Sequence, residues 1–216
     1  WGKYQFFLFL GTTLIINSLT RGLFLSNAIE LSEHIRNGTL DFILLKPIDT
    51  QFLVSLGRIE WSALGPLGFG VLLMGHAFWR LGYAPGPLAV VLFVFYVACG
   101  CAIYYSLMIA LSATAIWFGR NQSLLDFWFY ITNFSRYPME IYRGAWGDPL
   151  RWTFTFLVPV LVAVNVPARM VVRPLDVQTA ADWTLPVFTI FATIAGLAAS
   201  RWIFQRALVS YRSASS

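Results

Sequence analysis

The chain has 216 residues, of which 58% are hydrophobic and only 12% are charged. Soluble domains carry roughly 25% charged residues, and disordered chains combine low hydrophobicity with high charge. The composition therefore excludes disorder, argues against a soluble domain, and predicts an all-α polytopic membrane bundle with one transmembrane domain over 1–216. The net charge is +5, but the basic residues are scattered singly. We expect them in loops and at membrane interfaces, with the lipid bilayer and no nucleic acid as partner.

The first apolar stretch, residues 4–25, predicts a membrane-spanning helix. Thr13, Asn17 and Arg21 follow one another at four-residue spacing, so they share one helical face. A polar face inside a spanning helix is expected to look into protein rather than lipid. The sequence starts at Trp1 without an initiator Met, so we expect the natural N-terminus to be missing.

Residues 26–51 are polar and lie between two apolar segments, and we call them the island. Asn27, with Glu30 three residues later, predicts the N-terminal cap of a new helix. Gly38 predicts the end of that helix. A shorter amphipathic piece follows from Leu40 to Leu45, so the island would hold a helix, a turn and a second helix outside the hydrocarbon.

The island also combines charged residues with apolar ones, namely Ile29, Phe42, Leu44 and Leu45. Ordinary loops between membrane helices are short and lack two amphipathic pieces. This composition favours a docking surface over a simple connecting loop.

The rest of the chain predicts further spanning helices separated by turns. Residues 52–79 predict a kinked, glycine-rich helix, 80–87 a turn, and 88–118 a helix of about 46 Å. A short aromatic segment covers 123–137, and 183–204 is a final spanning helix. In that last helix, small residues at four-residue spacing predict a packing face: Ala192, Gly196 and Ser200.

Residues 138–182 are interrupted repeatedly by proline. Within them, 152–168 is marginal in length, with Pro159 in its middle and Pro167 at its expected end. We predict that it enters the membrane and does not cross it. The 15 Lys and Arg residues divide eight against seven between the two predicted sides, so their count does not orient the protein.

Motifs for chemistry are absent from the sequence. It has no GxxxxGK[ST], HExxH, CxxC or GxSxG stretch, and its two histidines, His34 and His76, lie far apart. We therefore expect no catalytic, cofactor-binding or metal site in this chain. An intramembrane enzyme would need a nucleophile paired with a base, and the sequence shows no such pair. A channel or a membrane-embedded substrate-capture subunit, neither of them driven by ATP, stays open as a function.

Three stretches, in the same order, resemble a bacterial ABC-transporter permease family of the type II exporter class. The first is residues 35–49, IRNGTLDFILLKPID, which is similar to the G-x-L-D-x-x-L-L-x-P stretch of that family. The second comprises FSRYP at 134–138 and FLVPV at 156–160, with NVPA at 165–168. The third is the ending YRSASS at 211–216.

The resemblance implies a multi-pass protein of the bacterial inner membrane, with six spanning helices in the full subunit and about five in this sequence. An amphipathic helix and the first spanning helix would precede Trp1. It places 26–51 and 205–216 in the cytoplasm, 81–87 and 140–150 outside, and an outer re-entrant helix pair over 138–170.

The resemblance also implies partners and roles. Two permease subunits, identical or different, would form the substrate path with two separate ABC ATPase subunits, which bind ATP and Mg²⁺. The path would follow the face of Thr13, Asn17 and Arg21. The residues expected to couple to the ATPase are Glu30, Glu33, Arg36, Gly38, Leu40, Asp41, Leu44, Leu45 and Pro47.

Overall fold

The computed structural model describes residues 1–118, 122–172 and 180–211, and every regular element within these ranges is a helix. Four helices are long and apolar enough to cross a membrane, and a bent helix pair makes a fifth if it counts as one span. The expected all-α membrane bundle is confirmed. Its α-helices are α1 (Lys3–Thr20), α2 (Ser26–Arg36), α3 (Leu40–Leu44), α4 (Thr50–Ser55), α5 (Gly65–Leu81), α6 (Pro87–Ala113), α7 (Ala115–Phe118), α8 (Gln122–Asn133), α9 (Gly147–Trp152), α10 (Val160–Val172) and α11 (Thr184–Ser210).

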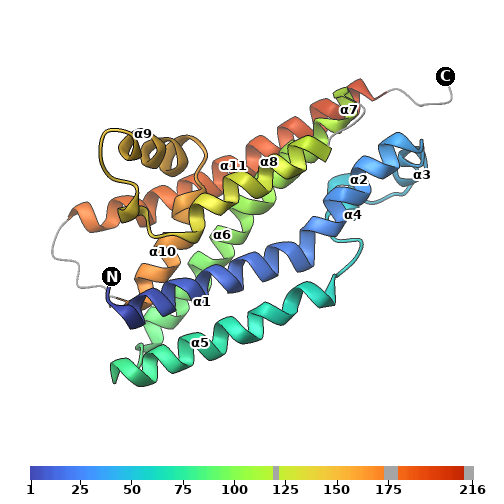
Figure 1. Cartoon of the computed structure of the whole chain (residues 1–216). Coiled ribbons are helices and arrows are strands. Elements are labelled where there is room, and N and C mark those ends of the chain that lie inside the picture. Colours follow the sequence, from blue (N-terminus) through green and yellow to red (C-terminus); the bar gives the residue numbers. More distant parts are fainter. Residues whose placement is uncertain (119–121, 173–179, 212–216) are drawn as a thin grey trace.

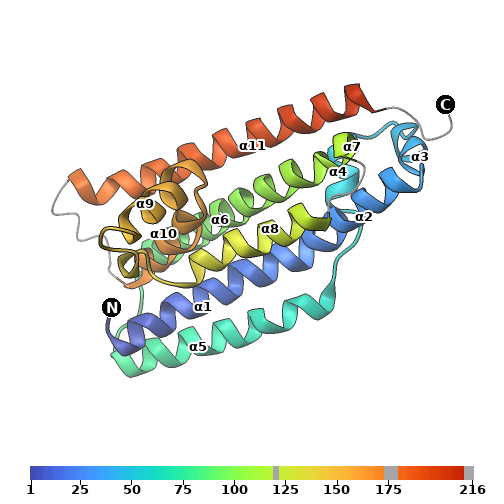
Figure 2. The same cartoon turned by 45° about the horizontal axis from the view of Figure 1, so that its top comes forward.

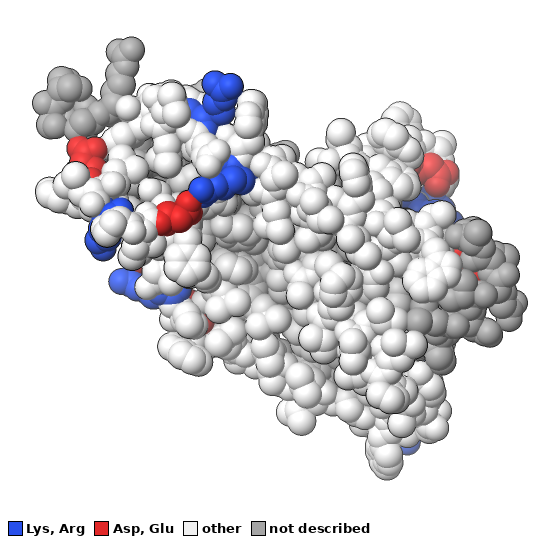
Figure 3. All heavy atoms as spheres, turned by 180° about the vertical axis from the view of Figure 1, so that it is seen from behind, with Lys and Arg blue, Asp and Glu red and all other residues white. Residues whose placement is uncertain are grey.

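The long helices run side by side along one direction. Figure 2 shows them in the order α11, α6, α8, α1 and α5 across the molecule. On the face drawn in Figure 3, charged side chains gather at the two ends, and a broad band between the ends carries almost none. Such a band is what the hydrocarbon of a bilayer requires of the protein surface, because a charge there loses its hydration.

The first spanning helix extends well beyond residue 25. Lys3–Arg36 is a continuous rod of 34 residues, about 51 Å long, and its segment Arg21–Leu25 is a π-helical turn. The prediction that Asn27 caps a new helix is wrong. The two residues before Asn27, Leu25 and Ser26, keep helical backbone angles, so the helix continues through this point. The charged residues that begin after residue 25 therefore mark where the rod leaves the apolar band. They do not mark a break in the helix.

Asn27 instead fastens a loop to this rod. Its side-chain amide donates to the carbonyl of Arg58 at 2.8 Å and accepts from the Arg58 backbone N–H at 2.9 Å. One π-turn carbonyl, that of Gly22, accepts the backbone N–H of Glu60 at 2.8 Å. A π-helical turn shifts the hydrogen-bond register of a helix, and here the loop supplies a partner from outside it.

Helix α5 is antiparallel to α1 and fixes how deep each residue lies. The Tyr4 and His76 rings pack near one end of the pair, at a centroid distance of 6.5 Å. At the other end, a Cβ on Gly22 would lie 2.6 Å from Leu64, just before α5 begins. The 18 residues from Tyr4 to Gly22 rise about 27 Å, close to the ~30 Å hydrocarbon thickness. The island-side edge of the membrane therefore lies near Gly22, and α2 projects beyond it.

The predicted helix over 52–79 is interrupted in the structure. Its first residues belong to the separate short helix α4, which Asp49 caps by accepting the Phe52 N–H at 2.9 Å. Residues 56–60 are not helical, and the 3₁₀ turn Trp61–Leu64 leads into α5. The turn predicted at 80–87 is confirmed, since α5 ends at Gly82 with φ 62° and α6 begins with Pro87.

Helix α6 is the centre of the bundle, and α10 packs tightly against it. Pro167 lies inside α10, so the prediction that it ends this helix is wrong. A proline has no N–H for the carbonyl four residues earlier, which here belongs to Ala163. That carbonyl oxygen faces α6 at Gly100, where an added Cβ would lie only 2.3 Å from it. The carbonyl freed by Pro167 is thus accommodated by the absence of a side chain on α6.

The small-residue face predicted on the last helix also packs on α6. Ala192 and Ser200 are buried, and a Cβ on Gly196 would lie 2.8 Å from the hydroxyl of Ser106. Small side chains let the two helix backbones approach closely, which is the main source of packing energy between helices in lipid.

The proline-broken segment is bent, as its sequence suggests. Gly147–Leu157 and Val160–Val172 meet at 85° across a two-residue break at Val158 and Pro159. Within the described residues, 152–168 is therefore not one straight helix. Aromatic stacking holds its first arm, because Phe154 lies 4.3 Å from Phe134 between ring centroids. Figure 1 shows α9 at the end of the bundle away from α3.

Candidate functional site

The island forms one end of the molecule. Figures 1 and 2 show α3 and α4 beside the end of α11, while the α5–α6 turn and α9 lie at the opposite end. Residues 26–51 and the described part of 205–216 thus share one end of the bundle, and 81–87 and 140–150 share the other. Which end faces the cytoplasm stays a prediction.

A sharp reversal after α2 places α3 next to it. Gly38 has φ 69°, a backbone conformation that side-chain-bearing residues rarely adopt, so its expected role in the turn is confirmed. The His34 ring and the Thr39 hydroxyl, 2.8 Å apart, hydrogen-bond across this turn. The reversal fixes which face of α3 is buried.

The buried face of the island rests on the ends of α6 and α11. Leu31, Ile35 and Leu40 form one apolar cluster with residues of these two helices, including Ile109 and Phe204. Leu40 is completely buried in this cluster. Among the residues expected to contact an ATPase, Leu40 therefore anchors α3 and presents nothing to a partner.

The outer face of the island, together with Phe52 of α4 just after it, is an apolar cap, made of Phe42, Leu44, Leu45, Ile48 and Phe52. All five side chains are exposed, Phe42 to 70% and Leu45 to 80%. Leucine and phenylalanine are exposed singly on many proteins, but five on one short helix–loop–helix segment are characteristic of a binding surface. The sequence prediction missed Ile48 and Phe52, because Phe52 was assigned to a spanning helix.

Some charged residues of the island are exposed, and others are paired. Glu33 and Arg36 are exposed, as is Pro47. Glu30 is half-buried and forms an ion pair with Arg58 at 2.6 Å. Asp41 is also half-buried and lies close to Tyr211. Burial first, and then the Asp41 charge, raise the pKa of Tyr211 above its ordinary value.

Polar links connect the island to two spanning helices. Asp49 forms an ion pair with Arg201 of α11, whose guanidinium also donates to Gln51 at 3.2 Å. Hydrogen bonds from Arg201, and then from the backbone N–H of Phe52, hold the pKa of Asp49 below its usual range. On α6, the hydroxyl of Tyr105 lies 3.1 Å from the Gln51 amide nitrogen. The island is therefore attached to α1, α6 and α11 together.

Of the three residues predicted to line a substrate path, Thr13 and Asn17 bond within their own helix, and Arg21 does not. Thr13 is buried, and its hydroxyl donates to the Phe9 carbonyl at 2.9 Å. Asn17 is half-buried and donates to the Thr13 carbonyl at 2.9 Å. Arg21, also half-buried, differs from both because its guanidinium lies over the Phe129 ring of α8 at 5.4 Å and makes no bond within its own helix.

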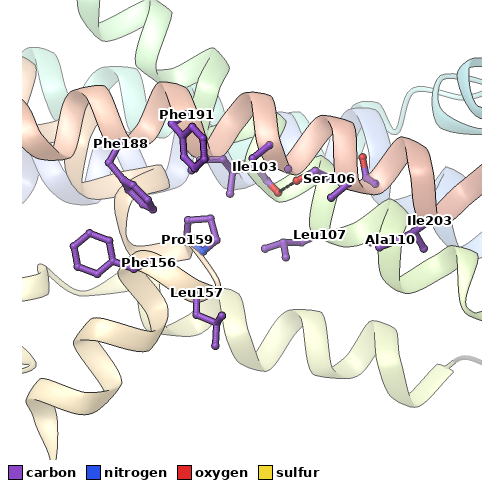
Figure 4. Close-up of a pocket in the computed structure, with 15 residues that line it drawn as sticks. Ile103, Ser106, Leu107, Ala110, Phe156, Leu157, Pro159, Phe188, Phe191 and Ile203 are labelled. Atoms are coloured by element: carbon purple, nitrogen blue, oxygen red, sulfur yellow. Dashed lines mark hydrogen bonds between the residues drawn. The ribbon is translucent and has the colours of Figure 1, made fainter.

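A lateral groove lies between α6, α11 and the broken helix pair. Its volume is about 330 Å³, and Figure 4 shows Phe156, Leu157 and Pro159 on one side, facing Phe188 and Phe191 of α11. Its lining is almost entirely apolar. No sequence signal predicted it, because its residues come from three distant segments. Within the described ranges, no three His, Cys, Asp or Glu side chains come together as metal ligands.

The fold and the island define a polytopic helical membrane protein with an exposed apolar cap at one end. Comparison with known families matches residues 1–215 to the ABC-2 family transporter proteins, and the chain belongs to that family. It is therefore a membrane component of a transport system. The same comparison confirms the resemblance to an ABC-transporter permease family. No curated protein and no solved structure matches the chain.

Proposed function

We propose that this chain is the permease subunit of an ATP-driven exporter in the bacterial inner membrane. It would work with a second permease and with separate ATPase subunits that bind ATP and Mg²⁺. The family supports the transport class, and the observation that carries the coupling role is the apolar cap, fixed on a rigid rod beyond the membrane edge.

The cap is suited to a groove on another protein. Five exposed apolar side chains on α3, α4 and their connection lose water on docking, which stabilises a complex in proportion to the area buried. The exposed charges of Glu33 and Arg36 lie beside the same turn and would orient the partner more than hold it, because exposed pairs contribute only about 0.2–1 kcal/mol.

Force on the cap would reach the spanning helices through the links already described. The continuous rod of α1 and α2, the Tyr105 contact on α6 and the Asp49–Arg201 pair on α11 leave the island little freedom to move alone. ATP binding would close the ATPase dimer, and the difference in its contacts with the cap between open and closed states would shift the permease between conformations.

The test compares two substitutions that add the same charge at opposite ends. Leu45→Asp lies in the cap, and Trp146→Asp, at an equally exposed apolar side chain, lies near α9. We expect Leu45→Asp to reduce ATPase co-purification and transport at least tenfold, and Trp146→Asp to leave both near wild type. If wild type binds no ATPase, the proposal fails, and a channel or capture subunit not driven by ATP takes its place.

A further inference from the structure

Two arginines lie at membrane depth on the same side of the chain. Arg21 precedes Gly22, which is level with the start of the α5 span, so it sits at the island-side edge of the hydrocarbon. Helix α8 runs away from the island end (Figure 1), and its Phe129 ring lies under Arg21. Arg136 follows Phe129 by seven residues, just after the end of α8. Seven residues rise about 10 Å along a helix, which places Arg136 within the apolar band.

Arg21 has no acceptor for its donors among the described residues. Its guanidinium forms no ion pair and donates no hydrogen bond there, and its Nε is buried without a partner. The contact with the Phe129 ring is not a hydrogen bond and occupies none of the five N–H donors. A buried donor without a partner is costly, so a missing acceptor is the expected explanation.

Arg136 adds a second positive charge near Arg21, so two guanidinium groups need an acceptor. It is exposed, and its charge repels that of Arg21. The neighbouring acids do not compensate: Glu140 binds Arg169 and the Trp1 indole N–H, and Asp126 of α8 forms no ion pair with either arginine. Neither guanidinium group therefore has an ion-pair partner among the described residues, and the two share one face at membrane depth.

The surroundings of the two groups indicate what they would bind. An exposed arginine within the hydrocarbon cannot face lipid tails, and such residues mark water-filled paths or substrate sites. Guanidinium groups match the planar oxygens of phosphates and carboxylates, and the bond is strengthened by charge on both sides. Asn17, one turn before Arg21, adds a polar side chain on the same face.

We propose that Arg21 and Arg136 form a site for an anionic group, a phosphate or carboxylate carried by the substrate or by a lipid headgroup, on the α1–α8 face. This proposal rests on the proposed function. It assigns the α1–α8 face to the substrate path and gives the cargo a negative charge. The anion enters at the membrane edge beside Arg21 and meets Arg136 about 10 Å further in.

The experiment measures anion binding by the full chain without an ATPase, so it can fail independently of the coupling proposal. The thermal unfolding midpoint in an uncharged detergent is followed while dioctanoyl phosphatidylglycerol, dioctanoyl phosphatidylcholine or inorganic phosphate is added. Arg80→Gln is the matched control, because Arg80 also lies over an aromatic ring, Trp79, at 5.2 Å but at the far end of α5.

We expect phosphatidylglycerol to raise the midpoint and phosphatidylcholine to leave it unchanged. The half-saturating concentration rises about tenfold in Arg21→Gln and in Arg136→Gln, less in Arg21→Lys, and not in Arg80→Gln. Stabilisation by inorganic phosphate alone would identify a soluble anion rather than a headgroup as the source. Should Arg21→Gln fail to fold, the exposed Arg136→Gln carries the test.

Two results would overturn the site. One is that neither anion stabilises the wild type, or that both do so equally in all variants. The other is that Arg21→Gln abolishes association with the second permease while anions have no effect, which would make an acidic residue of that subunit the missing partner.

Discussion

The contact between α6 and α10 gives a sharp prediction for Gly100→Ala. The new Cβ would lie 2.3 Å from the Ala163 carbonyl oxygen, 3.2 Å from its carbonyl carbon and 3.3 Å from Ile16 Cδ1. The first two are backbone atoms of a helix on which α6 packs, so they cannot turn aside as a flexible side chain does. The two helices must separate.

The size of the effect follows from two opposing terms. Overpacking a close contact costs about 1–3 kcal/mol, and a rigid backbone contact places this case at the upper end. Alanine is better than glycine within a helix by about 0.5–1 kcal/mol, which offsets part of the loss. The net loss of about 2–2.5 kcal/mol corresponds to a fall of about 4–10 °C in the unfolding midpoint for a chain of this size.

Tryptophan fluorescence during heating measures this directly, since the chain has nine tryptophans. Gly75→Ala is the matched control: Gly75 lies within α5, and a Cβ there meets nothing within 4 Å. Gly75→Ala should gain only the helix preference of alanine over glycine, and so raise the unfolding midpoint by about 1–4 °C. If Gly100→Ala is as stable as Gly75→Ala, the carbonyl freed by the proline in α10 does not lie against α6, and the packing described here is wrong.

Three further predictions concern the island. Asp49→Asn should break the ion pair with Arg201, leaving ATPase binding intact while transport per ATP hydrolysed falls severalfold. In the wild type the lowered pKa of Asp49 keeps its carboxylate ionised, and this link intact, as pH falls through the ordinary titration range of an aspartate; coupling should be lost only as pH falls through the lowered value. Gly38→Val should destabilise the turn by about 1–3 kcal/mol because of the positive φ, and ATPase co-purification should drop with it. Single cysteines at Leu45 and Ala84, in a background without the native ones, should be labelled from opposite faces of the membrane; labelling from one face would refute the topology.

The sequence predicted those features that depend on local patterns. Apolar stretches located the spanning helices, and Gly38 and Pro159 marked a real reversal and a real bend. Both depend on what a single residue does to its own backbone. The docking role of the island was inferred from the same kind of local evidence, and Leu45 is indeed exposed.

Features that depend on partners distant in the chain were missed. Asn27 looks like a helix cap, but its hydrogen bonds go to Arg58, and no local pattern reveals that loop. Pro167 looks like a helix end, but the glycine opposite its freed carbonyl lies on another helix. Leu40 is apolar like the residues of the docking surface, but it is buried in the core. In each case tertiary contacts override a correct local preference.

Photo-crosslinking in the intact complex tests the central claim most directly. Benzoylphenylalanine replaces Phe42 in the apolar cap or, as a control, Trp146 at the opposite end, both of which are exposed aromatic positions. We expect a crosslink from position 42 to the ATPase subunit, with a yield that changes when ATP is added, and none from position 146. Crosslinking of position 42 to lipid or to the second permease alone, with no ATPase adduct, would contradict it.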